Sequence, residues 1–271
     1  MIAPLMLLAC RAPEEAPRRC NGHAELCDRP LSEVALPATH NSMSNADDGW
    51  MVPNQHHGIP QQLEDGVRGF LFDVHEGDDG QPALCHAYCS LGSTPLDEGL
   101  GWFEDFLQEN PDEVLEFIIE DDLPAADISS VFEQVGLDRY AFVLGEDDPT
   151  LGELIDADTR LLVTAESDGP PPDWYQHAWD LYWDTPYEFA TAEDFTCDLN
   201  RGDPANPLFL VNHWVGELPY DENAAEVNTT EVLGARAEAC AAQWAHIPNL
   251  VAVDFYDEGD LFAVVDGLNG L

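Results

Sequence analysis

Two histidines lie in segments that could cleave a phosphate ester by acid–base catalysis. His40 stands between a Thr and an Asn, and His86 follows a Leu-Cys pair. Between them, an apolar run ends in an acid, Asp73. In-line cleavage of a phosphodiester needs one group to accept a proton from the attacking hydroxyl and another to protonate the leaving oxygen. Two imidazoles at the ends of neighbouring strands would supply both groups.

Apolar runs and amphipathic segments alternate along the chain from residue 33 onward. Strands are predicted at 33–36, 67–74, 114–119, 141–144, 160–164, 208–212 and 250–255. Helices are predicted to end at 61–66, to cover 95–109, 125–135, 151–155 and 222–242, and to begin again at 260. The segment 168–206 shows no regular pattern. This alternation predicts an α/β fold with a parallel sheet, and the length of 271 residues suits a single-domain TIM-type (β/α) barrel of irregular or incomplete form.

Polar residues follow the ends of most predicted strands. They are His40, Asp73, His86, Glu120, Glu166, His213 and Asp254. In a closed β/α barrel, the carboxyl ends of the strands share one face, and the active site lies there. We therefore expect these side chains to surround one site.

The order of segments resembles the X domain of phosphatidylinositol-specific phospholipase C, over residues 31–269. The resemblance implies that His40 is the general base and His86 the general acid. It implies that Asp254, on the last strand, holds His40 in the correct tautomer. The implied activity is a phosphoric diester hydrolase that cleaves phosphatidylinositol-type phospholipid to diacylglycerol and a cyclic inositol phosphate.

The same resemblance implies a metal ion. Calcium-dependent members bind Ca²⁺ through residues that correspond here to Asn41, Asp73 and Glu120, which offer the hard oxygens that Ca²⁺ prefers. Metal-free members carry an Arg where this chain has His75, so we expect Ca²⁺ as the cofactor. Calcium-dependent members usually carry a Glu where this chain has Leu71, a departure for which Asp121, Asp122 or His75 could substitute. The alternative is that Asp73 and Glu120 only orient the histidines.

Three further residues are predicted to contact substrate: His75, His213 and Arg68. His75 could instead ligate a metal or pack at the rim, and a salt bridge is the alternative for Arg68. The aromatic residues of the irregular segment are expected to pack into the body of the fold rather than to form a lipid-facing rim: Trp174, Trp179, Trp183 and Tyr187.

The charge is extreme, with 54 acids against 9 basic residues and a net charge of −45. Such a surface repels nucleic acid and opposes an anionic membrane. It favours a solvated shell suited to high salt over a calcium-rich surface. We expect a monomer whose partners are a membrane surface and a phospholipid or glycerophosphodiester substrate. A soluble glycerophosphodiester or a lysophospholipid would remove the repulsion, whereas a catalytically weak headgroup-binding barrel would not need both histidines.

The amino-terminal segment predicts export. Residues 1–10 are apolar and end in Leu-Leu-Ala-Cys10, which resembles a lipoprotein signal, so we expect lipid attachment at Cys10. Residues 11–30 are predicted to form a tether and a Cys-closed loop, and residues 31–271 the barrel. The sequence does not fix how the remaining cysteines pair, but locality favours Cys20–Cys27 and Cys85–Cys89, leaving Cys197–Cys240. Paired thiols indicate a secreted or cell-envelope protein, and the absence of a CxxC pair disfavours zinc at these cysteines.

Overall fold

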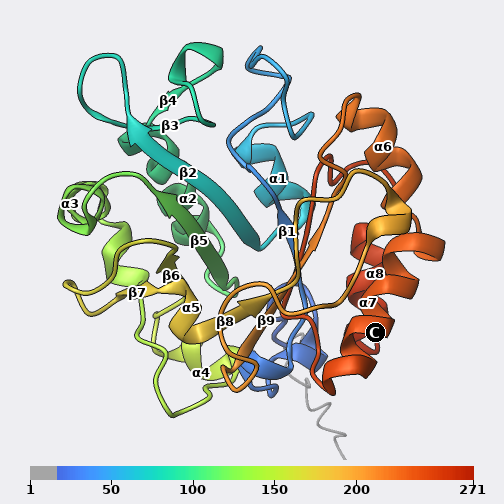
Figure 1. Cartoon of the computed structure of the whole chain (residues 1–271). Helices are drawn as coiled ribbons and strands as arrows, with labels where there is room; N and C mark the ends of the chain where they lie inside the picture. Colours follow the sequence, from blue (N-terminus) through green and yellow to red (C-terminus); the bar gives the residue numbers. More distant parts are fainter. Residues whose placement is uncertain (1–16) are drawn as a thin grey trace, which may run out of the picture.

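The computed structural model describes residues 17–271, so the predicted signal segment and Cys10 lie outside the described residues. Eight parallel strands form one curled sheet in the order β7-β6-β5-β2-β1-β10-β9-β8 (Figure 1). They are β1 (Leu36–Thr39), β2 (Gly69–Glu76), β5 (Leu115–Asp121), β6 (Leu161–Ala165), β7 (Tyr175–His177), β8 (Tyr182–Asp184), β9 (Leu208–His213) and β10 (Leu250–Val253).

The barrel is open at one seam. Its strands follow one another around the ring in chain order, but β7 and β8 stand at the two ends of the hydrogen-bonded path. The four-residue helix α5 (Ala178–Leu181) joins them directly. The predicted single-domain barrel of incomplete form is confirmed.

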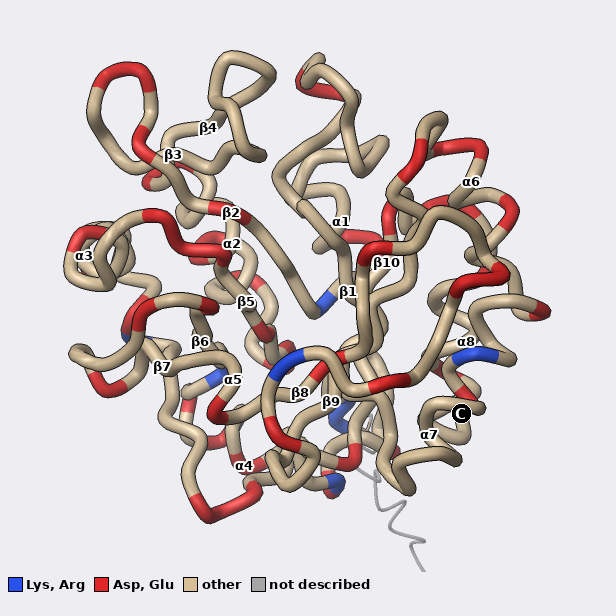
Figure 2. The backbone as a smooth tube through the Cα atoms, in the orientation of Figure 1, with Lys and Arg blue, Asp and Glu red and all other residues tan. Residues whose placement is uncertain are grey.

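Helices cover the outside of the sheet. They are α1 (Ile59–Asp65), α2 (Leu96–Glu109), α3 (Ala125–Val135), α4 (Leu151–Asp156), α6 (Tyr220–Val227), α7 (Ala235–Trp244) and α8 (Leu261–Asn269). In Figure 1, α2 and α3 flank the strands on one side and α6, α7 and α8 on the other. Acidic residues are spread over loops and helices all around this frame (Figure 2). Within residues 17–271, no helix is both long enough and apolar enough to cross a bilayer.

Side chains alternate between the barrel interior and the helix layer, as the pleat of a strand requires. In β2, Phe70 and Phe72 pack outward against Phe103 of α2. Leu71 packs inward in the same cluster as Ala38 of β1. Asp73 and His75 have the same parity as Leu71. This alternation therefore decides which polar residues reach the mouth of the barrel.

A short antiparallel hairpin extends the carboxyl half of β2. Its strands are β3 (Pro82–Leu84), which pairs with β2 from Val74 to Glu76, and β4 (Thr94–Pro95). His86 follows β3, inside the small loop closed by the disulfide Cys85–Cys89. The general acid predicted from the sequence thus stands on an appendage of the barrel rather than on one of its eight strands.

The Cys20–Cys27 loop lies at the amino ends of the strands. Asn21 exchanges two hydrogen bonds with the backbone of Val114, at 2.7 and 3.1 Å. Leu26 is buried in the interior cluster. The disulfides Cys20–Cys27, Cys85–Cys89 and Cys197–Cys240 are all present, so the pairing favoured by locality is confirmed.

Two predicted strands are wrong. No strand forms at 141–144, where Phe142 and Leu144 are buried in the interior cluster and only Ala141 makes a β-bridge, to Leu161. The predicted strand at 33–36 is also displaced, because Leu31–Glu33 forms a 3₁₀ turn and β1 starts at Leu36. In both places the apolar residues that predicted a strand are buried without forming one, since a loop or turn can bury apolar side chains as well as a strand can.

The predicted helix at 222–242 is two helices, α6 and α7, separated by a π-helical turn at Thr230–Gly234. The interruption follows Asn228, whose side-chain amide donates to the carbonyl of Asp254 at 2.8 Å. A tertiary contact therefore outweighs continuous helical spacing. The segment 168–206, which looked irregular, contains the short strands β7 and β8.

Candidate active site

The carboxyl ends of the strands surround a cavity of about 270 Å³. Its polar lining includes His40, Asn41, Asp73, Glu120, Glu166 and Asn212. Four of the nine predicted site residues, His40, Asn41, Asp73 and Glu120, therefore meet in one place. His40 and Asn41 follow β1, Glu120 is next to the last residue of β5, and Asp73 lies opposite Glu120 in the register of β2 and β5.

His40 and Asp254 form a hydrogen-bonded pair at the base of this cavity. The Nδ1 atom of His40 lies 2.8 Å from Oδ1 of Asp254, whose side chain is only 5% exposed. A carboxylate can only accept hydrogen bonds, so Nδ1 donates and the Nε2 lone pair remains free. An imidazole in this tautomer can accept a proton from a bound hydroxyl.

Two residues of the loop after β1 hold the pair in place, and no sequence motif marked them. Asn54 donates from Nδ2 to both carboxylate oxygens of Asp254, at 3.2 Å each. Gln55 donates from Nε2 to the carbonyls of His40 and Val253, at 2.8 and 3.1 Å. Because these hydrogen bonds connect His40, Asp254 and the neighbouring backbone, the His40 imidazole has one defined orientation.

The Trp214 ring packs flat against His40. Its ring stacks on the His40 imidazole with 3.8 Å between centroids and an interplanar angle of 3°. Trp214 follows β9 directly and also lines the cavity. The stacking fixes the plane of the imidazole, while the Asp254 bond fixes its rotation within that plane.

His86 is exposed and does not line the cavity, but it lies near enough to His40, His75 and Asp254 to interact with them electrostatically. Partial removal from water lowers its pKa below the usual histidine value, and the nearby imidazoles of His40 and His75 lower it further. Asp254 opposes this shift. The lowered pKa favours the neutral form of His86, and a bound anion would favour its protonated form.

His75 lies inward on β2, two residues beyond Asp73. Its Nδ1 atom is 2.6 Å from Oδ2 of Asp122, and its side chain is 14% exposed. Its Nε2 atom is buried without a hydrogen-bond partner among residues 17–271. A buried polar atom without a partner is costly, so this nitrogen is available to a ligand.

Carboxyl groups dominate the cavity. Asp73 is buried, and burial together with the charges of Glu120, Glu166 and Asp122 raises its pKa well above the usual range. Burial and Glu120 also raise the pKa of Glu166 to about 7, although Arg201 opposes this shift. Several acids that lose solvation and repel one another are a typical surrounding for a cation.

Arg201 is the one guanidinium in the lining of this cavity, and the sequence reasoning missed it. Its Nη1 atom contacts Glu166 at 2.7 Å and its Nη2 atom contacts Asp184 at 2.6 Å. The guanidinium also stacks on Trp179, 3.9 Å from the ring centroid. Two carboxylates already occupy this cation, so little positive charge remains for a phosphate.

Arg68 is not in the cavity, contrary to expectation. It precedes β2 and therefore lies at the amino end of the barrel. Its Nε atom contacts Glu113 at 2.7 Å, and Nη1 donates to the carbonyls of Leu63 and Val67. The alternative reading of a structural salt bridge is correct, and Arg68 is removed from the substrate-binding set.

His213 is also misplaced, by one residue. It is buried on the outer face of β9, where Nε2 donates to the carbonyl of Val227 at 3.0 Å and Nδ1 accepts from Arg236 at 3.1 Å. Burial and Arg236 lower its pKa to about 3. The inward position belongs to its neighbour Asn212, which lines the cavity. Successive side chains of a strand point to opposite faces, so Asn212 faces inward and His213 faces outward.

The aromatic residues of the former irregular segment mostly pack into the body, as expected. Trp183 is buried against Phe209, with ring centroids 3.7 Å apart. Trp174 and Trp179 pack at the edges of the two main clusters. Tyr187 is the exception, because it is 37% exposed and lines the cavity.

Comparisons with known proteins point to one family. The model of the PI-PLC X family, PI-PLC X 1, matches residues 26–269. The chain is 31% identical to "PI-PLC X domain-containing protein 1" of Arthroderma benhamiae, over 93% of this chain and 90% of that protein. It is 28% identical to an "Uncharacterized secreted protein" of the same organism, over 94% of this chain and 64% of that protein.

A solved structure resembles the fold. It is phosphatidylinositol-specific phospholipase C from Listeria monocytogenes, with a TM-score of 0.61 and 16% identity, over 91% of this chain and 97% of that one. At this identity the likeness concerns the architecture alone.

Proposed function

Since the chain belongs to the PI-PLC X family, whose fold supports a phosphodiesterase-type hydrolase, we propose that it cleaves phosphatidylinositol-type phospholipid with the help of Ca²⁺. The products would be diacylglycerol and a cyclic inositol phosphate, which water then opens. One observation carries the calcium requirement. The cavity that must receive an anionic phosphodiester is lined by four acids, Asp73, Glu120, Asp122 and Glu166, against one paired Arg.

The donor set suits a hard divalent cation. Asn41 donates from Nδ2 to Asn54 at 3.3 Å, which leaves its oxygen available, and Asp73 and Glu120 add carboxylates. The Asp73 side chain accepts no hydrogen bond within the described part of the chain. Its pKa is raised mainly by burial and further by the neighbouring acids, whose repulsion a cation would relieve. When bound, Ca²⁺ would neutralise charge on the phosphoryl oxygens.

His40 would take the first proton. Its free Nε2 accepts the proton of the inositol hydroxyl while that oxygen attacks phosphorus, and Asp254 stabilises the resulting imidazolium through Nδ1. His86 would supply the second proton. As the bond from phosphorus to the glycerol oxygen breaks, His86 protonates that oxygen and diacylglycerol leaves. His40 thus gains a proton and His86 loses one. When water opens the cyclic phosphate, His86 would accept a proton from that water and His40 would return its proton to the inositol oxygen, which restores both residues.

An apolar rim beside His86 supports a membrane-bound substrate. Met51 and Val52 are 61% and 49% exposed, and Tyr88 and Leu91 are 69% and 37% exposed. The two loops adjoin, since the amide of Met51 donates to the carbonyl of Leu91 at 2.8 Å. Neighbouring exposed apolar residues are typical of a surface that contacts lipid.

The net charge of −45 favours a second candidate, a soluble glycerophosphodiester or a lysophospholipid. Such a substrate would not require approach to an anionic surface. Lipid attachment through Cys10, which lies outside the described residues, would instead place the protein at the membrane. The three disulfides and the secreted relative support a location outside the cytosol.

The calcium requirement is tested with the full chain on vesicles of phosphatidylinositol and phosphatidylcholine in moderate to high salt. Excess chelator is expected to reduce hydrolysis by about 100-fold or more, because the unneutralised acids then repel the phosphate. Asp73→Asn should cause a similar loss, and added Ca²⁺ should not restore its activity. Asp78→Asn, an exposed change of equal charge on the neighbouring hairpin, should behave as wild type.

Activity that ignores the chelator would contradict the calcium proposal and make His75 the cation that faces the phosphate. If the folded protein does not hydrolyse inositol lipid with or without Ca²⁺, the substrate is another phosphodiester.

The rim distinguishes a membrane substrate from a soluble one. Met51→Ser combined with Tyr88→Ser is expected to lower vesicle hydrolysis by about tenfold, since burial of two large apolar side chains in lipid is lost. The same variant should hydrolyse a monomeric, short-chain inositol lipid at the wild-type rate. Val143→Ser, an equally exposed change near the amino end of β6, is the control. Equal losses on vesicles and monomers would count against the rim as a lipid contact.

A further inference from the structure

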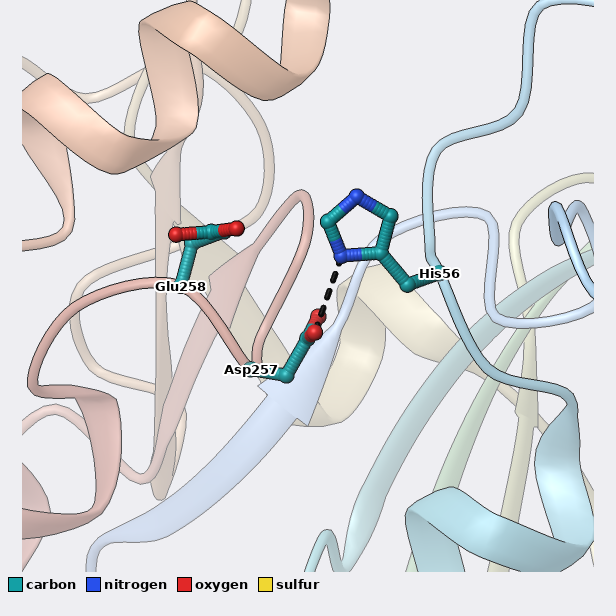
Figure 3. Close-up of side chains that lie close together, drawn as sticks. All are labelled: His56, Asp257 and Glu258. Atoms are coloured by element: carbon teal, nitrogen blue, oxygen red, sulfur yellow. Dashed lines mark hydrogen bonds and ion pairs between the residues drawn. The ribbon is translucent and has the colours of Figure 1, made fainter.

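We propose that His56, Asp257 and Glu258 form a structural binding site for a divalent transition metal ion of the zinc type, separate from the catalytic cavity. One potential ligand atom from each residue lies within 4.8 Å of the other two. Figure 3 shows the imidazole and the two carboxylates facing a common space between two loops. The proposal is independent of the calcium site, because none of the three lines the cavity.

The geometry is close to that of a ligand set. The Nδ1 atom of His56 and Oδ2 of Asp257 are 2.8 Å apart and share a proton that a metal would replace. Bonds of about 2.0–2.2 Å from zinc to nitrogen and oxygen place tetrahedral ligands about 3.3–3.5 Å apart.

A second imidazole points to the same place from outside the cluster. The Nε2 atom of His57 lies 3.8 Å from Oδ2 of Asp257, while its Nδ1 atom is held by Asp47 at 2.8 Å. Histidines that ligate metals are commonly oriented by a carboxylate on the other ring nitrogen in this way. Imidazole together with carboxylates suits zinc and its neighbours rather than Ca²⁺, which prefers oxygen ligands only.

The two loops that carry these ligands also support the general base. Asn54 and Gln55 precede His56 and hold Asp254 and the His40 carbonyl. Phe255 follows Asp254, and its amide donates to the carbonyl of Asn54 at 2.8 Å. A metal between His56 and Asp257 would therefore join the same two segments a few residues from the catalytic pair, and would stabilise them without touching substrate.

The test measures metal binding and thermal stability, and neither readout requires catalysis. The full chain is freed of metal with chelator and titrated with Zn²⁺ by calorimetry, and the bound metal is counted after dialysis. The Asp73→Asn background removes binding at the acidic cavity. In that background we expect one zinc per chain and a higher Tm with zinc than without it.

His56→Ala and Glu258→Gln should each weaken zinc binding by about 100-fold or more and abolish the rise in Tm. His177→Ala and Glu222→Gln, which change the same residue types elsewhere on the surface, should leave both unchanged. Zinc affinity in both His56→Ala and Glu258→Gln equal to that of the parent would overturn the site, as would failure of the parent to bind zinc. Neither result would bear on the calcium proposal, since Asp73→Asn already lacks that site.

Discussion

Replacement of His40 by alanine is expected to lower phosphodiester hydrolysis by about 10³- to 10⁴-fold, with little change in substrate affinity. The attacking hydroxyl is a weak nucleophile until its proton is accepted. In this site His40 has a free Nε2 fixed by Asp254 and Trp214. The measurement is the initial rate on phosphatidylinositol vesicles, with circular dichroism and Tm to establish that the variant folds.

A rescue experiment makes the His40 prediction specific. The variant leaves a slot against the Trp214 ring beside Asp254, which free imidazole can occupy. Added imidazole should therefore restore part of the rate of His40→Ala but should not affect wild type. His177→Ala serves as the matched control, since it removes a partly exposed histidine from β7. A folded His40→Ala protein that retains wild-type activity would remove His40 from the role of base.

Replacement of His86 by alanine is expected to slow hydrolysis by about 10²- to 10³-fold when the leaving group is a glycerol oxygen. The loss should be far smaller with a nitrophenyl or methylumbelliferyl leaving group, because such an oxygen departs without a proton. The comparison needs inositol phosphate esters that differ in the leaving group alone. Equal losses on the two classes would refute the acid role and leave His86 as a binding residue.

The pH profile gives a second readout of the same role. Partial burial and two nearby imidazoles lower the pKa of His86, so its acid form is lost at a lower pH than for an ordinary histidine. Activity that requires protonated His86 should therefore fall as pH rises through that lowered pKa, unless a bound phosphate anion raises it. In His86→Ala this alkaline decline should disappear.

The sequence was sufficient for residues whose position follows from a strand end. Asp73 and Glu120 each close an apolar run, and Asp254 follows the last strand, so parallel strands in a barrel bring them together without knowledge of any contact. The three disulfides were also predictable, because two of them close loops of fewer than ten residues and the third pair is what remains. Local pattern and fold class carry that information.

Other features depend on contacts between distant segments and could not be read locally. Strand β9 is buried on both faces, so its residues from Leu208 to Val211 are all apolar and do not reveal which side chains face inward. For this reason His213 rather than Asn212 was predicted to face the site. Asn54 lies 200 residues from Asp254 in the chain, in a loop with no recognisable motif. Arg201 was overlooked because its partners are distant in the chain, since Glu166 follows β6 and Asp184 ends β8.

The placement of His86 separates two tasks of the reaction. The proposed base, His40, is built into the barrel through β1 and β10, whereas the proposed acid, His86, stands on a disulfide-closed loop at the end of a hairpin added to β2. Insertions or deletions in that hairpin can move the acid without disturbing the strands that orient the base. Choice of leaving group can therefore diverge among relatives while activation of the nucleophile stays constant, because each is encoded in its own stretch of chain.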